Sequence, residues 1–227
     1  MAEEDALLRE VEEELRRERL EKLWKRYGNL FLALSVGLVL AVAGYKGWQY
    51  YQRQQAEAAG KAYVEALDLV HAGKTEAAEA ALRKLMEGGH AGAAGLARLR
   101  LAAMLAKQGK TREALDLYAQ ASADESLSLP YRNAARVRQA WLMVDTASRE
   151  ELAKLLGGLD VAGNPWRTAA REILALAALR EGDGKTAAKY LKQILSDPET
   201  PPDARSRANV LLNAIGKASA AKETAGR

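Results

Sequence analysis

Three Gly-Lys-Thr triplets are the residues of this chain whose types and order could do chemistry: Gly73-Lys74-Thr75, Gly109-Lys110-Thr111 and Gly184-Lys185-Thr186. The same three residues end a P-loop, in which backbone amides and the lysine bind phosphate. A P-loop also needs a glycine five residues before the Gly-Lys-Thr glycine, and the sequence has Asp68, Met104 and Leu179 there. We therefore interpret the triplets as turns that open helices, with the threonine near the N-cap.

The remaining candidates for catalysis or metal binding are few. The chain has two histidines, His71 and His90, too far apart in this pattern for a metal pair, and it has no cysteine. The absence of cysteine excludes disulfides, thiolate metal sites and thiol nucleophiles. Basic residues alternate with acidic ones and form no aromatic-rich basic stripe, which disfavours nucleic-acid binding. We expect no enzyme, no cofactor, no metal and no small-molecule substrate.

One uncharged stretch sets the organisation of the chain. Nineteen residues, 27–45, carry no charge, and as a helix they would cover roughly 29 Å, which is one bilayer span. Aromatic side chains at both ends fit the depth of lipid headgroups. These predicted interface residues are Trp24, Tyr27, Tyr45, Trp48, Tyr50 and Tyr51.

The flanking charges predict the orientation of this span. Seven basic residues lie within twenty residues before it, and Lys46, Arg53 and Lys61 follow it. The positive-inside rule then places the N-terminus in the cytoplasm. A cleaved signal peptide is the alternative, because Ala41-Val42-Ala43 resembles a cleavage site. Nine acidic residues before the span, and aromatic residues beyond the proposed cut, favour an anchor.

Segments on both sides of the span are predicted to be helical. Residues 1–26 read as a cytoplasmic, amphipathic, charged helix that contacts headgroups or a partner, or as a merely solvated helix. Residues 46–59 read as a helical stalk. Within the span, Ala33, Gly37 and Ala41 recur at every fourth residue and could pack against another transmembrane helix, or could face lipid.

A repeat of about 36 residues follows the stalk. The glycines Gly73, Gly109 and Gly182 are 36 and 73 residues apart, and a fourth turn is predicted at 145–148. Small and large residues recur around these turns at fixed positions. They are Ala66, Ala102 and Ala175 before the turn, Ala78, Ala114 and Ala187 after it, and then Leu82, Tyr118 and Leu191. This code of small and large residues resembles the tetratricopeptide repeat, a helical hairpin.

The predicted fold is therefore all-α: a single N-terminal transmembrane helix, then a tetratricopeptide-like α-solenoid of about four hairpins, residues 60–216, ending in a capping helix. The third hairpin departs from the pattern, because Arg138 takes its small position and Glu150 its alanine position. That hairpin is predicted to be either splayed or displaced. Residues 217–227 are small and polar, and we expect a disordered tail.

Such a solenoid binds partners in the groove lined by the first helix of each hairpin. The residues counted onto that groove are Tyr63, Leu67, His71, Leu99, Lys107, Arg132, Gln139, Met143, Glu172, Leu176 and Arg180. Packing against a neighbouring helix is the alternative role for each of them.

The residues around the span resemble the YfgM-like family of bacterial inner-membrane proteins, which are tetratricopeptide-like ancillary subunits of the SecYEG translocon. The resemblance lies in 11–16, 23–28 and Gly47-Trp48-Gln49-Tyr50-Tyr51, and the repeats cover the rest. It implies repeats in the periplasm and an association with the SecYEG translocon and a PpiD-like periplasmic chaperone. The hypothesis is a non-catalytic adaptor that also holds client polypeptides.

Two other roles stay open from the sequence alone. A self-assembling scaffold for the envelope or for cell division would use the groove between copies of the chain. A regulator would use the helix before the span to bind a cytoplasmic signalling protein.

Overall fold

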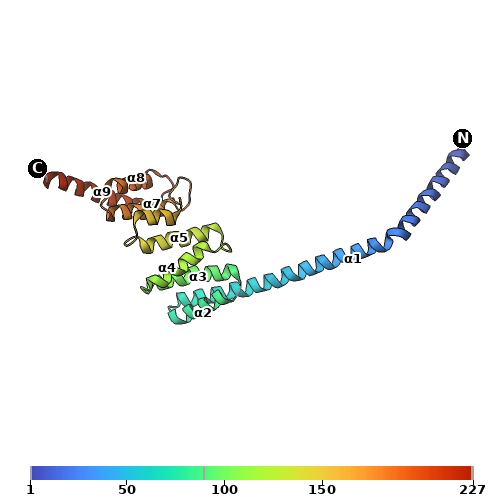
Figure 1. Cartoon of the computed structure of the whole chain (residues 1–227), viewed down its shortest axis with the longest axis horizontal. Coiled ribbons are helices and arrows are strands. Elements are labelled where there is room, and N and C mark those ends of the chain that lie inside the picture. The colour runs from blue at the N-terminus through green and yellow to red at the C-terminus, as the bar shows by residue number, and fades with distance from the viewer. Residues whose placement is uncertain (1, 89, 226–227) are drawn as a thin grey trace. The chain divides into compact units, whose positions relative to one another are not determined.

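The computed structural model describes residues 2–88 and 90–225 of the chain, and every regular element in this part is an α-helix (Figure 1). The helices are α1 (Ala2–His71), α2 (Thr75–Glu87), α3 (Ala91–Lys107), α4 (Thr111–Ala123), α5 (Leu129–Met143), α6 (Arg149–Leu156), α7 (Arg167–Arg180), α8 (Gly184–Ser196) and α9 (Pro202–Ala225). They fall into two compact units, Met1–Glu57 and Ala58–Arg227.

Helix α1 contains the segments that the sequence separates into 1–26, 27–45, 46–59 and the first repeat helix. The helix has no break at any of these boundaries. Of residues 1–71, only Met1 lies outside the described part of the chain. Among the described residues, this is the one helix long and apolar enough to cross a membrane, judged by its length and composition. Leucine and valine side chains between Leu30 and Val42 are more than half exposed in the described structure.

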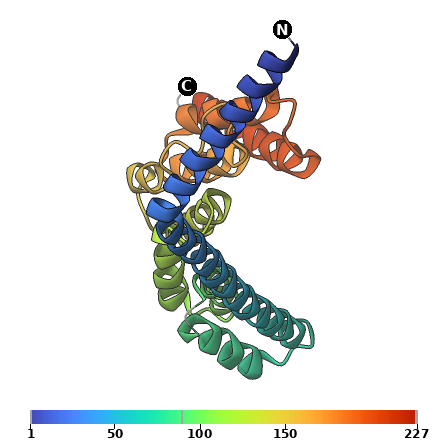
Figure 2. The same cartoon turned by 90° about the vertical axis from the view of Figure 1, so that its right-hand side faces the viewer.

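The second unit consists of the predicted helical hairpins, stacked one after another (Figures 1 and 2). The last part of α1 pairs with α2, α3 with α4, α5 with α6 and α7 with α8, and α9 packs on α8. We call α1 (residues 60–71), α3, α5 and α7 the A helices, and α2, α4, α6 and α8 the B helices. The expected four hairpins with a capping helix are present.

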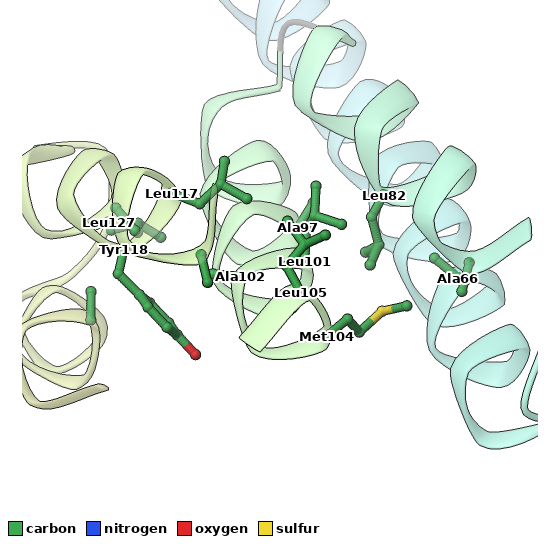
Figure 3. Close-up of a cluster of buried hydrophobic side chains, with 14 residues drawn as sticks. Ala66, Leu82, Ala97, Leu101, Ala102, Met104, Leu105, Leu117, Tyr118 and Leu127 are labelled. Carbon is green, nitrogen blue, oxygen red and sulfur yellow. The ribbon is translucent and has the colours of Figure 1, made fainter. Parts of the chain in front are cut away.

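Burial confirms the code of small and large residues in the first, second and fourth hairpins. Ala66, Ala102 and Ala175 on the A helices are fully buried, as are Ala78, Ala114 and Ala187 on the B helices. Figure 3 shows Leu101 and Leu105 of α3 between Ala66 and Leu82 on one side and Leu117 and Tyr118 on the other. The alanines let the helix backbones approach closely, and the larger side chains fill the space between them.

The glycines of the triplet turns terminate the A helices. Gly73 and Gly109 have φ values of 71° and 77°, in the left-handed region that favours glycine. The next amide, of Lys74 or Lys110, donates to the carbonyl five residues earlier at 2.9 Å. These bonds are those of a Schellman motif. The backbone amides that a P-loop would offer to phosphate are thus used to end a helix.

The third hairpin is displaced by two residues relative to the sequence prediction. Arg138 and Glu150, predicted at the small positions, are exposed, whereas Ala140 and Leu152 are fully buried. Ala140 and Leu152 are twelve residues apart, which is the spacing from Ala66 to Ala78. The cause is the loop between α4 and α5, residues 124–128, which is two residues longer than the loop at 88–90 between α2 and α3.

The third turn, residues 144–148, is held by a capping box and by the next hairpin. The Ser148 hydroxyl accepts a hydrogen bond from the Glu151 amide, and the Glu151 carboxylate accepts one from the Ser148 amide at 2.8 Å. Arg149 forms an ion pair with Asp183 at 2.7 Å. This ion pair therefore connects the third turn to the fourth, although the third turn contains no glycine.

Two loops near the C-terminal end are joined by arginines from α7. Arg167 donates to both carboxylate oxygens of Asp197 and to Glu199. Arg171 donates to the Asp160 carbonyl at 2.9 Å and lies 3.4 Å from Asp197. The loops before α7 and after α8 are fixed to one helix by these bonds.

Helix α9 is longer than predicted. The sequence predicts a disordered tail from Lys217, but in the structure the helix continues to Ala225, and residues 226–227 lie outside the described part. From Lys217 to Ala225 the segment contains four alanines, two lysines and one glutamate, which are strong helix formers.

Candidate functional site

The A helices carry the residues that the sequence predicts to line a groove. In the first two hairpins Tyr63, Leu67 and Leu99 are partly buried, while His71 and Lys107 are exposed. Tyr63 and Leu99 pack against the core cluster that α1 to α4 share. These side chains therefore combine packing with an accessible surface.

Residues from three successive A helices come together at Tyr63. Burial raises the pKa of the Tyr63 hydroxyl, the positive charge of Arg100 on α3 opposes this rise, and the Tyr131 hydroxyl on α5 adds to it. Such effects require the three groups to lie within electrostatic range of one another. We call the accessible faces of α1 (residues 60–71), α3 and α5 the A-helix face. The sequence prediction missed Arg100 and Tyr131.

The displaced register changes which residues of α5 belong to this face. Val64, Arg100 and Arg138 each stand two residues before the buried alanine of their own helix, Ala66, Ala102 or Ala140. Val64 and Arg138 are exposed, and Arg100 is half-buried. These three residues occupy equivalent positions on three neighbouring helices and form a row.

The three residues predicted on α5 lie elsewhere on that helix. Arg132, Gln139 and Met143 are partly buried, and Met143 packs against the core of the third and fourth hairpins. The Arg132 Nε and the Gln139 Oε1 are buried without a hydrogen-bond partner. The two-residue shift of register explains why counting from position 145 selected Gln139 and Met143.

In the fourth hairpin two predicted groove residues are bound within the chain. Glu172 is 5 % exposed, and both of its carboxylate oxygens accept hydrogen bonds from Arg207 of α9, at 2.6 and 2.9 Å. Arg180 donates to the carbonyls of Val144 and Ala147 in the third turn. Only Leu176 keeps a partly exposed side chain without such a bond. Glu172 and Arg180 therefore hold neighbouring elements together.

Charge is distributed unequally between the helices of the middle hairpins. Helices α3 and α5 contain no aspartate or glutamate, and their basic residues are Arg98, Arg100, Lys107, Arg132, Arg136 and Arg138. The B helices α2 and α4 contain five acidic residues, Glu76, Glu79, Glu87, Glu113 and Asp116. Of the six basic residues, only Arg98 forms an ion pair among the described residues, with Asp124 at 2.8 Å.

The outer B helices bind their charges to each other. Glu79 of α2 accepts from Arg83 at 2.8 Å and lies 3.7 Å from Lys110, and Arg83 lies 3.4 Å from Glu113 of α4. The hydrogen bond from Arg83 holds the pKa of the Glu79 carboxyl below its usual value. Acids and bases on this side neutralise one another, in contrast to the A-helix face.

The predicted membrane residues are all exposed. Trp24, Tyr27, Tyr45, Trp48, Tyr50 and Tyr51 are each about half exposed or more. Gln49, Gln54 and Gln55 donate to the hydroxyls of Tyr45, Tyr50 and Tyr51 one turn earlier, at 2.9 to 3.1 Å. Ala33, Gly37 and Ala41 are exposed as well, and a Cβ added at Gly37 would meet no atom within 4 Å. The stripe of Ala33, Gly37 and Ala41 is thus exposed to another transmembrane helix or to lipid.

Nothing in the described part of the chain gathers residues for metal chemistry. Groups of three or more metal-ligating side chains are absent from the residues that were placed. His71 is exposed, and the Nδ1 of His90 is buried without a hydrogen-bond partner. What the described arrangement offers is a contact surface on helices.

Comparison with known proteins agrees with this architecture. The family model for a tetratricopeptide repeat-like domain matches residues 21–156, which is more than half of the chain. Neither a curated protein nor a solved structure gives a significant match. Domains of this family are protein-interaction modules, in agreement with the surface on the A helices. The chain belongs to the tetratricopeptide repeat-like domain family.

Proposed function

We propose that this chain is a membrane-anchored adaptor that holds other proteins on the A-helix face of its repeats. The observation that carries the proposal is that the match to a tetratricopeptide repeat-like domain, residues 21–156, includes a segment of α1 that is long and apolar enough to cross a membrane. An anchor restricts the search of a binding domain to the membrane surface and so raises its effective concentration near membrane partners.

The apolar segment 27–45 supports insertion in a bilayer. Its exposed leucines and valines would be costly in water, at roughly 25 cal/mol per Å² of apolar surface. The aromatic side chains at its ends suit the headgroup region, and their hydrogen bonds to Gln49, Gln54 and Gln55 satisfy the tyrosine hydroxyls there. The basic residues before Tyr27 favour a cytoplasmic N-terminus.

The proposed place of action is the periplasmic side of a bacterial inner membrane, beside the SecYEG translocon. This part of the proposal rests on the resemblance of the residues around the span to the YfgM-like family. The repeats would link the translocon to a PpiD-like periplasmic chaperone and hold client polypeptides as they emerge. The predicted contact residues are those of the A-helix face, with Tyr63, Leu67 and Leu99 as its apolar part.

Site-specific crosslinking tests the proposal. A photoreactive phenylalanine analogue at Leu99, on the A-helix face, is compared with one at Ala119, an exposed residue of the B helix α4. We expect the Leu99 variant to capture translocon subunits and periplasmic chaperones in membranes, and the Ala119 variant to capture neither. Crosslinks from Leu99 only to other copies of the chain would favour a self-assembling scaffold. Cytoplasmic partners lost on deletion of residues 1–22 would favour a regulator.

The orientation has its own test, because the chain has no cysteine to interfere. Single cysteines replace the exposed residues Arg16 and Lys192, one on each side of the apolar segment. A membrane-impermeant maleimide added to spheroplasts should label the Lys192→Cys protein and leave the Arg16→Cys protein unlabelled until the membrane is opened. The opposite pattern would contradict the periplasmic placement of the repeats.

A further inference from the structure

We propose that the A-helix face of the first three hairpins binds an acidic, apolar peptide segment of a partner protein. This inference rests on the proposed function and adds the chemistry of the partner. It starts from the separation of charge: α3 and α5 carry six basic residues and no carboxylate, whereas the B helices around them are rich in acids.

The basic residues of this face lack ion-pair partners among the described residues. Arg100, Lys107 and Arg138 form no ion pair in the described structure. The Arg100 Nε is buried and has no hydrogen-bond acceptor, a situation that costs free energy in the unbound protein. A carboxylate placed beside these groups would supply the missing charge and acceptors.

Apolar side chains lie beside these charges. Tyr63 is within electrostatic range of Arg100 and of Tyr131. Val64 and Tyr131 are about half exposed. A purely acidic partner would leave these groups in water, whereas a segment with aliphatic or aromatic residues between its carboxylates would cover them. This mixture of groups favours a peptide as the occupant.

The occupied part of the face ends before the fourth hairpin. Glu172 is the acidic residue of α7, and Arg207 already neutralises it. Arg180 is engaged by the carbonyls of Val144 and Ala147, and Ile173, at the position equivalent to Arg100 and Arg138, is fully buried. Among the described residues, α7 thus offers neither an unpaired positive charge nor the open row. The partner segment is expected to contact α1, α3 and α5.

Peptide binding to the full-length protein in detergent tests the inference. The probes are three fluorescein-labelled 12-residue peptides with the same leucines and phenylalanines and with Glu, Gln or Lys at every remaining position. We expect the Glu peptide to bind roughly tenfold or more tightly than the Gln peptide, and the Lys peptide to bind weakest. Raising the salt concentration should reduce this difference.

A pair of double variants locates the binding surface. Arg100→Gln/Arg138→Gln should weaken binding of the Glu peptide roughly tenfold. The matched control, Lys84→Gln/Arg112→Gln, removes the same charge from exposed positions on the B helices α2 and α4 and should leave the affinity unchanged. The reversed variant, Arg100→Glu/Arg138→Glu, should prefer the Lys peptide. Circular dichroism melting confirms that each variant is folded.

Each opposite result overturns the inference in a distinguishable way. If Glu and Gln peptides bind equally, or if both double variants behave alike, the acidic preference is wrong, while crosslinking of partners from Leu99 would keep the adaptor proposal. If no peptide binds and Leu99 captures no partner, both proposals fail. If a 12-nucleotide single strand competes as well as the Glu peptide, the face is a general polyanion site and the peptide assignment is wrong.

Discussion

Gly95 of α3 lies directly against Leu127 in the loop between α4 and α5. A Cβ atom at Gly95 would come within 2.6 Å of the Leu127 side chain, closer than real Cβ contacts. Leu127 is 4 % exposed and belongs to the core of the first two hairpins. The absence of a side chain at this position therefore allows the loop to close over α3 and to direct the chain into the third hairpin.

Gly95→Ala should destabilise the repeats. The added methyl group must displace the buried Leu127, and overpacking of this kind costs about 1–3 kcal/mol. The matched control is Gly92→Ala, one turn earlier on α3, where an added Cβ meets nothing within 4 Å. The control should gain about 0.5–1 kcal/mol, because alanine is the better helix former. Urea unfolding followed by circular dichroism measures both, and equal effects of the two changes would contradict the observed packing.

The displaced register of the third hairpin makes the next prediction. Ala140→Leu introduces a large side chain at a fully buried position and should lower the free energy of unfolding by about 1–3 kcal/mol. Arg138→Leu changes an exposed residue and should alter it by less than about 0.5 kcal/mol. The register counted from position 145 predicts that Arg138→Leu is the more destabilising change. Thermal unfolding of the two variants therefore decides between the two registers.

Much of the fold could be predicted from the sequence, because glycine and alanine have strict roles in it. Turns with a left-handed residue at Gly73, Gly109 and Gly182 require glycine, and close helix packing requires the buried alanines. The third turn lacks such a glycine, and the loop between α4 and α5 is two residues longer than the loop between α2 and α3, so counting at a fixed period selected Arg138 and Glu150, two residues too early. The register of a turn without glycine depends on tertiary packing, which is not local information.

The residues of the A-helix face were only partly predictable from the sequence. Tyr63, Leu67, Leu99 and Lys107 follow from the spacing of the first two turns, which the structure keeps. The ion pair between Glu172 and Arg207 was not predictable, because it joins residues 35 apart in the sequence and depends on where α9 packs. The lack of carboxylates on α3 and α5 was visible in the sequence, but it has meaning only once both helices are known to share a face.

The pair of Glu172 and Arg207 should control how firmly α9 caps the stack. Arg207→Ala leaves a buried carboxylate without its partner. Removal of one member of a fully buried pair costs about 3–5 kcal/mol, and since Arg207 is about half exposed, we expect about 1–3 kcal/mol. Glu172→Leu/Arg207→Leu should recover most of the loss, because no charge is then left buried.

Hydrogen exchange shows where this loss occurs. Amide protection in α9 should fall in the Arg207→Ala protein more than protection in α3, which belongs to a different core cluster. A uniform loss along all hairpins would mean that α9 does not open separately. A double variant as unstable as the single one would show that the pair contributes favourable energy beyond the neutralisation of Glu172.

Acid should weaken the junction around Asp197. Its hydrogen bonds with Arg167 lower the pKa of the Asp197 carboxyl from 3.8 to about 2. A carboxyl whose folded pKa is depressed contributes stability that is present above its unfolded pKa and is lost as the pH falls through the folded pKa. The melting temperature should therefore fall between about pH 4 and about pH 2, and Asp197→Asn should have a shallower slope there.

Asp183, with its pKa also lowered to about 2 by Arg149, keeps part of the slope in that variant. Asp116→Asn, at an exposed residue of α4, should keep the full slope. If Asp197→Asn keeps it too, Arg167 does not stabilise the charged form of Asp197 in solution. The loops around α7 are then held by the hydrogen bonds that the Arg171 side chain donates to the carbonyls of Asp160 and Gln193.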